Sequence, residues 1–422
     1  MKRFHTLALS LTSASVLSSA TAAAADWTQY NGTNSDRATT EQLPSTKLPK
    51  KPAWKTSTNT GFSSFTVAGG KAYTLVRDEI EGIEREICLA LDAASGKPAW
   101  KSELTVLRYG HDGGNSGARD NKGGDGPRST PTIDNGHVYV IDSDINLFCL
   151  DANSGDKIWS VSVLKDHDGE NIKWKNAASP LIDGNLVYLA GGGKNQALLA
   201  FDKTTGKNVW KAESDAMTHA TPIATTIHGQ RQIIFFTQEG LVALTADKGD
   251  VLWRYDFPFK VSTAASPVVD GDIVFCSAGY GVGGGAVKIN KSGSKFTADE
   301  IWRKDNDVIN HWSTPLVIDG HLYGMFSFKK YGTGPLACVD IKTGKQLWAE
   351  DGFGPGNVTR AGNKLIALSD SGSVVIVDPS PEGYQELSRT DVLDGKCWSS
   401  PILANGSIYA RSTEQAVRLD LK

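Results

Sequence analysis

A step of serine or threonine followed by proline recurs along the chain. Seven residues of types that bind ligands stand before, or near, such a step. Arginine, lysine and histidine donate hydrogen bonds to anions and hydroxyl groups, and tryptophan offers a flat apolar face with one N–H donor. Gathered at one place, such side chains would suit a planar or sugar-like ligand that carries a negative charge or hydroxyl groups. The alternative is that these large side chains fill a channel and pack against adjoining loops. The seven candidates are Arg128, Trp174, His219, His311, Trp312, Lys396 and Trp398.

The sequence offers no comparable set for catalysis or for metal binding. No nucleophile, base and orienting acid can be assembled from spacing, so the catalytic residues are unknown. The segment 101–128 is rich in oxygen donors, but their spacing matches no known calcium loop, and we expect no metal site there. A calcium site in this segment stays open as the alternative. Its candidate ligands are Asp112, Asn115, Asp120 and Asp125.

The five cysteines do not indicate a disulfide framework or a metal site. There is no Cys-x-x-Cys pair, which excludes a covalently attached haem and most zinc sites. Cys149 and Cys338 each stand two residues before an aspartate, at equivalent positions of different repeats. We therefore predict that the chain has no structural disulfide.

A phrase that runs from aspartate through glycine to tryptophan repeats along the chain. In each full copy the tryptophan follows the aspartate by eight residues and the glycine by four, and the copies end at Trp100, Trp159, Trp210 and Trp348. A fifth copy ends at Trp253 but has Thr245 in place of the aspartate. We expect the glycine to supply a positive φ in the turn between the third and fourth strands and the aspartate to bond the amides of the turn. The tryptophan should pack between neighbouring blades.

The serine- or threonine-proline step opens a second phrase, in which an apolar pair and a turn with aspartate or asparagine and glycine follow. The six prolines are Pro131, Pro180, Pro222, Pro267, Pro315 and Pro401. The last interval, of 86 residues, is about twice the others, so we expect a repeat without proline around Val358, and Phe65 to Gly70 supplies one more. Short apolar runs give each repeat of about 40 to 50 residues four strands, which is the size of a propeller blade. The sequence therefore predicts an all-β fold, an eight-bladed β-propeller of four-stranded antiparallel blades.

The two ends of the chain predict how the ring closes. The last repeat stops at Ala416 to Asp420 without a tryptophan phrase, whereas Lys51 to Lys55 contains Trp54 without preceding strands. An N-terminal strand that completes the C-terminal blade explains both observations and removes the exposed sheet edges. In such a ring the loops before the first strands open on one face, around the channel. The residues three positions before each proline should then share one rim.

The N-terminus is typical of export. Lys2 and Arg3 precede an apolar stretch from about Leu7 to Leu17, and small residues follow up to Ala25. This pattern predicts a signal peptide over residues 1–25, a strap over residues 26–50 and a single propeller domain over residues 51–422. A membrane anchor is the weaker alternative, because the apolar run is about half the ~20 residues that a spanning helix needs.

Composition limits the cellular locations and the classes of partner that we expect. No cysteine precedes Cys88, so we expect a periplasmic or secreted protein that is not a lipoprotein. With 44 lysines and arginines against 47 aspartates and glutamates, the chain has no basic surplus for nucleic acid. No later segment is long and apolar enough to be a transmembrane segment.

The phrases from Ala90 to Trp100 and from Ala177 to Tyr188 resemble the tryptophan-docking repeat of pyrroloquinoline-quinone (PQQ)-like propellers. The chain is also similar to BamB-like exported propellers, whose best-known member is a scaffold lipoprotein in outer-membrane β-barrel assembly. This resemblance implies a binding or scaffold protein of the periplasm or cell envelope, whose partner is an envelope protein or a small-molecule or glycan ligand.

The resemblance also implies an alternative, a PQQ-dependent oxidoreductase that acts on an alcohol or a sugar. Such enzymes hold the quinone under a disulfide between adjacent cysteines, beside a calcium ion. No two cysteines are adjacent here. We therefore expect a role other than catalysis, with PQQ and calcium as cofactors only under this alternative.

Overall fold

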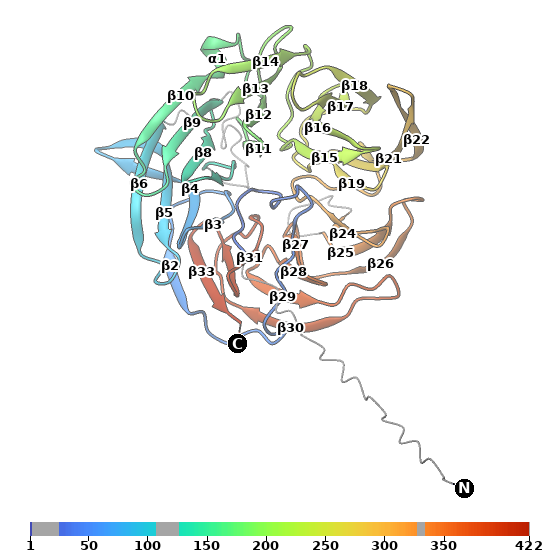
Figure 1. Ribbon diagram of the computed structural model, residues 1–422. Coiled ribbons are helices and arrows are strands. Elements are labelled where there is room, and N and C mark those ends of the chain that lie inside the picture. The colour runs from blue at the N-terminus through green and yellow to red at the C-terminus, as the bar shows by residue number, and fades with distance from the viewer. Residues whose placement is uncertain (2–24, 107–125, 327–333, 422) are drawn as a thin grey trace.

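The computed structural model describes residue 1 and residues 25–106, 126–326 and 334–421. Eight β-sheets stand as blades around a central channel, each with four antiparallel strands (Figure 1). The one helix among the described residues is the four-residue α1 (Val163–Asp166). The predicted eight-bladed, all-β propeller is confirmed.

The blades are numbered in chain order, and the strands of each run from the channel outward. Blade 1 contains β3 (Thr66–Ala68), β4 (Lys71–Ile80), β5 (Ile83–Asp92) and β6 (Pro98–Val106), and blade 2 contains β7 (Thr132–Asp134), β8 (His137–Ile141), β9 (Asn146–Asp151) and β10 (Lys157–Ser162). Blade 3 contains β11 (Leu181–Asp183), β12 (Leu186–Ala190), β13 (Leu198–Asp202) and β14 (Asn208–Ala212), and blade 4 contains β15 (Ile223–Ile227), β16 (Gln230–Thr237), β17 (Gly240–Thr245) and β18 (Val251–Asp256).

The second half of the ring repeats this order. Blade 5 contains β19 (Val268–Asp270), β20 (Ile273–Ala278), β21 (Gly283–Ser292) and β22 (Lys295–Asp305), and blade 6 contains β23 (Leu316–Ile318), β24 (His321–Met325), β25 (Leu336–Asp340) and β26 (Gln346–Glu350). Blade 7 contains β27 (Asn357–Ala361), β28 (Lys364–Leu368), β29 (Ser373–Val377) and β30 (Glu386–Asp391), and blade 8 contains β31 (Ile402–Ala404), β32 (Ser407–Arg411), β33 (Gln415–Asp420) and β2 (Trp54–Ser57). Six first strands begin directly after the predicted prolines, and β27 contains Val358, as expected.

The ring closes between the two ends of the chain. Strand β2 pairs antiparallel with β33, and Trp54 lies opposite Arg418. The buried Arg411 of β32 reinforces the junction, since its Nη1 donates to Thr74 Oγ1 at 2.6 Å and to the Leu75 carbonyl at 3.0 Å in blade 1. The predicted closure by an N-terminal strand is therefore confirmed.

The repeated tryptophans pack on the glycine turn of the next blade. A Cβ atom on Gly96 would lie 2.6 Å from the Trp54 ring, and one on Gly155 would lie 2.6 Å from the Trp100 ring. Trp54 Nε1 donates to the Ala93 carbonyl at 3.0 Å, beside that turn. These contacts confirm the structural role predicted for the aspartate-glycine-tryptophan phrase, whose glycines all have positive φ and whose Asp92 accepts the Ser95 amide at 2.8 Å.

Three tryptophans differ from this pattern. Trp348 ends a full phrase, but its Nε1 donates to the Ser380 carbonyl at 2.7 Å in the next blade, where a Cβ atom on the nearby Gly383 would meet nothing within 4 Å. Trp302, which ends no recognisable phrase, docks on Gly344, where a Cβ atom would lie 2.8 Å from the ring. Trp253 is buried, but its Nε1 donates to Gln232 Oε1 at 2.7 Å within its own blade. A tryptophan therefore docks where the neighbouring blade has a glycine turn. The phrase that ends at the tryptophan predicts this docking only in part.

All five cysteines are buried free thiols. Four of them lie on strands of different blades: Cys88 in blade 1, Cys149 in blade 2, Cys276 in blade 5 and Cys338 in blade 6. Burial raises the pKa of each of these thiols. They pack as small apolar side chains.

The segment 25–42 crosses the centre of the ring (Figure 1). Its short strand β1 (Ala38–Thr39) pairs parallel with β27, the innermost strand of blade 7. Backbone or side-chain hydrogen bonds join the segment to the first strands, or the residues just before them, of seven blades. These bonds end at Val67, Ile133, Ile182, Ala224, Ser266, Val358 and Ser400.

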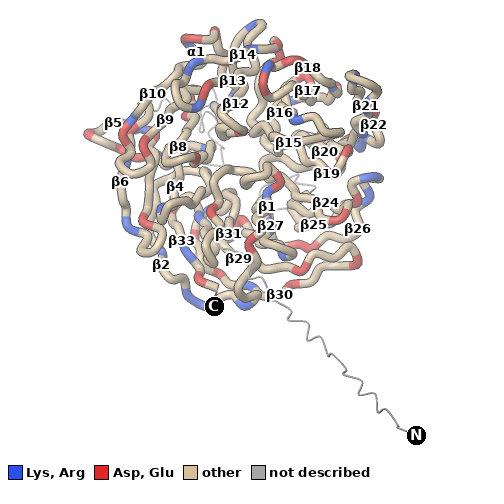
Figure 2. The backbone as a smooth tube through the Cα atoms, viewed as in Figure 1, with Lys and Arg blue, Asp and Glu red and all other residues tan. Residues whose placement is uncertain are grey.

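No helix among the described residues is long and apolar enough to cross a bilayer. Figure 2 shows the positions of basic and acidic residues interspersed along the backbone around the ring. The charge distribution therefore marks no preferred side of the ring.

Candidate ligand-binding rim

Each first strand runs from the loop that enters its blade to a turn with aspartate or asparagine and glycine at the other end. The segment 25–42 bonds with these turns at Gly362 and Asn405. The entry loops therefore open at the opposite end of the channel. We call the following aromatic and basic residues at this end of the channel the rim: Phe62, Arg128, Lys173, Trp174, Tyr280, His311, Trp312, Lys396 and Trp398.

Three aromatic rings from distant parts of the sequence stack in the rim. The ring centroids of Trp312 and Trp398 lie 4.3 Å apart, and those of Phe62 and Trp398 lie 5.4 Å apart with the planes at 28°. Trp312 Nε1 donates to the Pro355 carbonyl at 3.1 Å, which fixes the indole in blade 7. The three rings remain partly exposed.

The contacts continue around the mouth of the channel. The His311 ring lies 4.7 Å from Trp312 and 5.0 Å from Tyr280, edge to face in both cases. The Tyr280 ring is parallel to Trp174 within 13° at 6.5 Å. The circle is completed by Arg128, whose guanidinium carbon lies 5.2 Å from the Phe62 ring and whose Nη1 lies 3.5 Å from the Trp174 carbonyl oxygen.

Basic groups lie over the aromatic faces of the rim. Lys173 Nζ is 4.6 Å from the Trp174 ring, and Lys396 Nζ is 4.7 Å from the Trp398 ring. Burial lowers the pKa of Lys396, and the opposing charge of Asp370 partly compensates. With Arg128, these groups make the rim attractive to ligands that combine flat rings with negative charge.

The two histidines are neutral at pH 7. His219 is only 5% exposed and lies beneath the rim, where its Nε2 is 2.9 Å from the Lys173 carbonyl oxygen and its Nδ1 is 2.9 Å from Ser262 Oγ. Burial, together with the positive charge of Arg128, lowers its pKa to about 4. Burial also lowers the pKa of His311 to about 3, with a contribution from His219. Of the seven predicted residues, six therefore meet at the mouth and His219 supports them from below.

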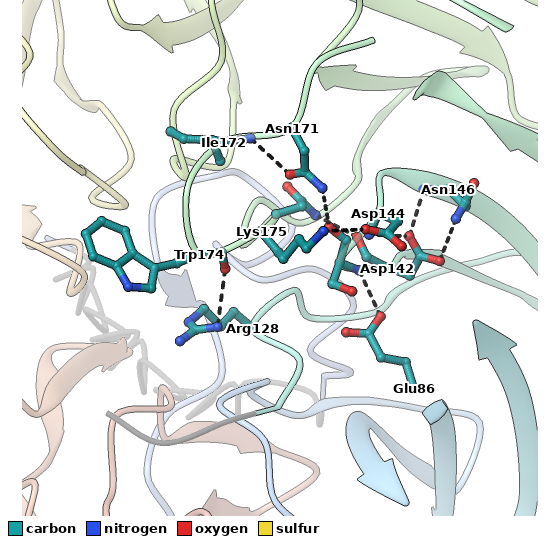
Figure 3. Close-up of polar contacts among 11 residues, drawn as sticks. Glu86, Arg128, Asp142, Asp144, Asn146, Asn171, Ile172, Trp174 and Lys175 are labelled. Atoms are coloured by element: carbon teal, nitrogen blue, oxygen red, sulfur yellow. Dashed lines mark hydrogen bonds and ion pairs between the residues drawn. The ribbon is translucent and has the colours of Figure 1, made fainter. Parts of the chain in front are cut away.

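The rim segment around Trp174 is held in an unfavourable backbone conformation. Trp174 and Lys175 have φ values of +68° and +63°, in the left-handed region that costs a non-glycine residue about 1–2 kcal/mol. Lys175 Nζ lies 3.1 Å from Asp144 Oδ1, and Asn171 Nδ2 donates to the Ser143 carbonyl at 2.8 Å (Figure 3). The segment is therefore held by the loop that joins β8 to β9.

The described residues suggest binding chemistry and assign no catalytic residue. Among the residues that the structure describes, no group of three histidine, cysteine, aspartate or glutamate side chains is placed to hold a metal ion. The oxygen-rich set of Asp112, Asn115, Asp120 and Asp125 lies outside the described residues. His219 makes hydrogen bonds and His311 packs against two aromatic rings. Either histidine would have to break these contacts to act as a general base.

Three contributors to the rim were not among the seven predicted residues: Phe62, Lys173 and Tyr280. Tyr280, which is 49% exposed, follows β20 in the loop to β21, and such loops open on the same face as the entry loops. Lys173 precedes Trp174 in the segment that leads to β11. The signal for Tyr280 was available, because any loop from a second to a third strand ends on that face.

A family described as outer membrane protein assembly factor BamB matches residues 84–350, which is well over half of the chain. Tetrathionate hydrolase from Acidithiobacillus ferrooxidans is 23% identical over 263 residues, which is 62% of this chain and 44% of that protein. The outer membrane protein assembly factor BamB of Shewanella oneidensis is 22% identical over 267 residues, 60% of this chain and 64% of that protein. The chain thus spans less than two thirds of the length of both relatives.

The fold has a close parallel among solved structures. Quinohemoprotein alcohol dehydrogenase from Comamonas testosteroni superposes with a TM-score of 0.67 at 13% identity, over 95% of this chain and 81% of that chain. At this identity the likeness concerns the propeller fold alone.

Proposed function

Because this chain belongs to the family of the outer membrane protein assembly factor BamB, we propose that it is a binding or scaffold protein of the cell envelope whose rim contacts a protein partner. The rim is rich in tryptophan, tyrosine and arginine, the residue types that dominate the binding energy of protein interfaces. Its contacts form a closed circle, so the aromatic faces are held in place before a partner arrives.

One observation carries this proposal. The two ends of the channel differ. The segment 25–42 bonds with the turns at one end, at Gly362 and Asn405, and its side chains reach along the channel as far as Ser266 and Ser400, whereas the other end presents partly exposed rings and three basic groups. A rigid ring with one such end can hold a partner without movement of its blades.

Export is part of the same proposal. The charged, apolar and small-residue order of residues 1–25 supports a signal peptide, with Asp26 as the first residue of the mature chain. The location would then be the periplasm or the exterior. N-terminal sequencing of the protein from the envelope and culture fractions of its host tests this, and an intact Met1 in a cytoplasmic fraction would contradict it.

Site-specific crosslinking tests the rim. A photoreactive amino acid at Tyr280 should capture a partner in the host envelope, whereas the same residue at Ile158 should not. The two side chains are matched, because each is 49% exposed and Ile158 lies on the outer strand β10 of blade 2. Equal capture from both positions would contradict a specific rim.

The captured partner then allows a quantitative test. Trp312→Ala and Trp398→Ala should each weaken its binding by roughly 1–3 kcal/mol, as expected for an interface anchor. Trp210→Ala, in the blade core, should mainly lower stability by about 3–5 kcal/mol. If the rim variants lose as much stability as Trp210→Ala and bind the partner normally, the rim tryptophans are channel packing.

The oxidoreductase alternative has a separate test. An absorbance spectrum of protein purified from its own host, with and without added quinone and calcium, would detect a bound quinone. A stoichiometric quinone band together with alcohol or sugar oxidation would replace the scaffold proposal.

A further inference from the structure

We infer that Glu86 and Asp142 are positioning residues, and that a neutral Glu86 carboxyl group near the Asp142 carboxylate keeps the Trp174–Lys175 segment of the rim in place. Their effect passes through the β8–β9 loop, residues 142–145, which carries the hydrogen bonds that hold the segment. The inference about the position of Trp174 stands by itself. The consequence of that position for partner binding rests on the proposed function.

Both carboxyl groups are buried and bind the β8–β9 loop, Glu86 at the Ser143 amide and Asp142 at Asn146 (Figure 3). Glu86 on β5 has no exposed surface, and Asp142 at the end of β8 is 1% exposed. Burial, together with the negative charge of Asp142, raises the pKa of Glu86 to about 8. Burial also raises the pKa of Asp142 to about 7, against the opposing effect of hydrogen bonds from Asn146.

Hydrogen bonds indicate which group holds the proton. Asp142 Oδ1 accepts the Asp144 and Asn146 amides at 2.9 and 2.8 Å, and its Oδ2 accepts Asn146 Nδ2 at 2.8 Å. Glu86 Oε2 accepts the Ser143 amide at 2.8 Å. Three donors stabilise the anion at Asp142, so the proton of the pair belongs on Glu86 at neutral pH.

Other charged groups face Glu86 from the elements around it. Asp144 lies on the same loop as Asp142 and adds negative charge, while Lys175 from the rim segment pairs with Asp144. Arg77 on β4 is the cross-strand neighbour of Glu86 and forms an ion pair with Glu84, on the same face of β5. Among the described residues, Glu86 is therefore surrounded by the carboxylates Asp142, Asp144 and Glu84 and by the cations Arg77 and Lys175. Loss of the Glu86 proton adds a buried negative charge near Asp142.

The β8–β9 loop transmits this charge to the rim. The Ser143 carbonyl accepts the Asn176 amide at 3.2 Å as well as Asn171 Nδ2, and the Asp142 carbonyl accepts Asn176 Nδ2 at 3.3 Å. These bonds flank the two left-handed residues, Trp174 and Lys175. When both carboxyl groups are ionised, their repulsion displaces the loop and the strained segment relaxes.

The test follows Trp174 directly and needs no partner. The full chain labelled with 5-fluorotryptophan gives a ¹⁹F resonance for Trp174, which the Trp174→Phe variant identifies. Between pH 6 and 9 this resonance should shift with a midpoint near the pKa of Glu86, about 8, while that of Trp210 stays constant. Glu86→Gln keeps the acceptor oxygen and should remove the transition. Glu84→Gln, two residues along the same strand, should leave it intact.

Two outcomes would overturn the inference: a Trp174 resonance that is constant from pH 6 to 9, or the same transition in Glu86→Gln. If Glu86→Gln does not fold, carboxyl ¹³C titration of the wild-type protein decides, because a Glu86 that ionises below pH 6 refutes the inference. A Trp174 transition with partner binding independent of pH would leave the positioning role intact and would count against the proposed rim function.

Discussion

The docking of tryptophan on glycine predicts a large difference between two glycine-to-alanine variants. Gly249 and Gly229 both have a φ of +75°. A Cβ atom on Gly249 would lie 2.7 Å from the Trp210 ring, whereas one on Gly229 would meet nothing within 4 Å. The two variants therefore share the backbone cost and differ in the tryptophan contact.

The expected magnitudes follow from this geometry. Alanine in the left-handed conformation should cost Gly229→Ala about 1 kcal/mol of the free energy of unfolding. Gly249→Ala must also move the indole by about 1 Å to restore ordinary carbon–carbon contacts of 3.5–4.0 Å. The indole also holds a 3.0 Å hydrogen bond from Nε1 to the Ala246 carbonyl. Since complete loss of a buried tryptophan costs about 3–5 kcal/mol, we expect Gly249→Ala to cost about 3–5 kcal/mol in total.

Urea denaturation, followed by tryptophan fluorescence and by circular dichroism, measures both variants and checks that the transitions coincide. In a Trp210→Ala background the cost of Gly249→Ala should fall to that of Gly229→Ala, since the indole is absent. Equal costs for the two glycines in the wild-type background would refute the reasoning. They would mean that the blades adjust to the added methyl group and that docking contributes little to stability.

Two further predictions concern the ring and the thiols. Deletion of residues 416–422 removes most of β33, including the buried Val417 and Leu419. The deletion should cause aggregation or a large loss of thermal stability. A deletion variant that melts like the parent would show that the chain ends do not need to pair. Thiol titration of the denatured, unreduced protein should find all five cysteines free, since each is a buried free thiol here; finding only one free thiol would contradict the structure.

The propeller was predictable because its evidence is repeated along the sequence. Each Ser/Thr-Pro step marks the start of a first strand, and the eight starts agree with one another, so an error at one repeat, such as the missing proline near Val358, is corrected by its neighbours. Ring closure was predictable for the same reason, since a missing phrase at one end matched the isolated Trp54 at the other.

The rim was predictable only in part, because repeat register fixes where a loop begins and says little about its path. Arg128, Trp312 and Trp398 were placed by their distance from a proline, and they lie in the circle of contacts. His219 has the same register, but its ring turns beneath the Lys173 carbonyl, which only the folded path of the segment 171–176 determines. The Glu86–Asp142 pair left no sequence signal, since the two residues come from different blades and neither belongs to a repeated phrase.

The segment 25–42 explains why the two ends of one channel differ in an otherwise repetitive fold. A closed ring of eight similar blades leaves the inner edges of its first strands facing the channel, with backbone groups that need partners. The segment supplies partners from the turn end, through β1 on β27, and its buried Arg37 guanidinium reaches along the channel to the Val358 carbonyl at 2.9 Å and to Ser400 Oγ at 2.8 Å. At the other end the first strands are entered by loops of unequal length, whose large side chains meet one another over the axis. Because a single segment without a repeat covers one end, the blades are free to vary at the other, and the variable end is where recognition by a propeller of this kind can evolve.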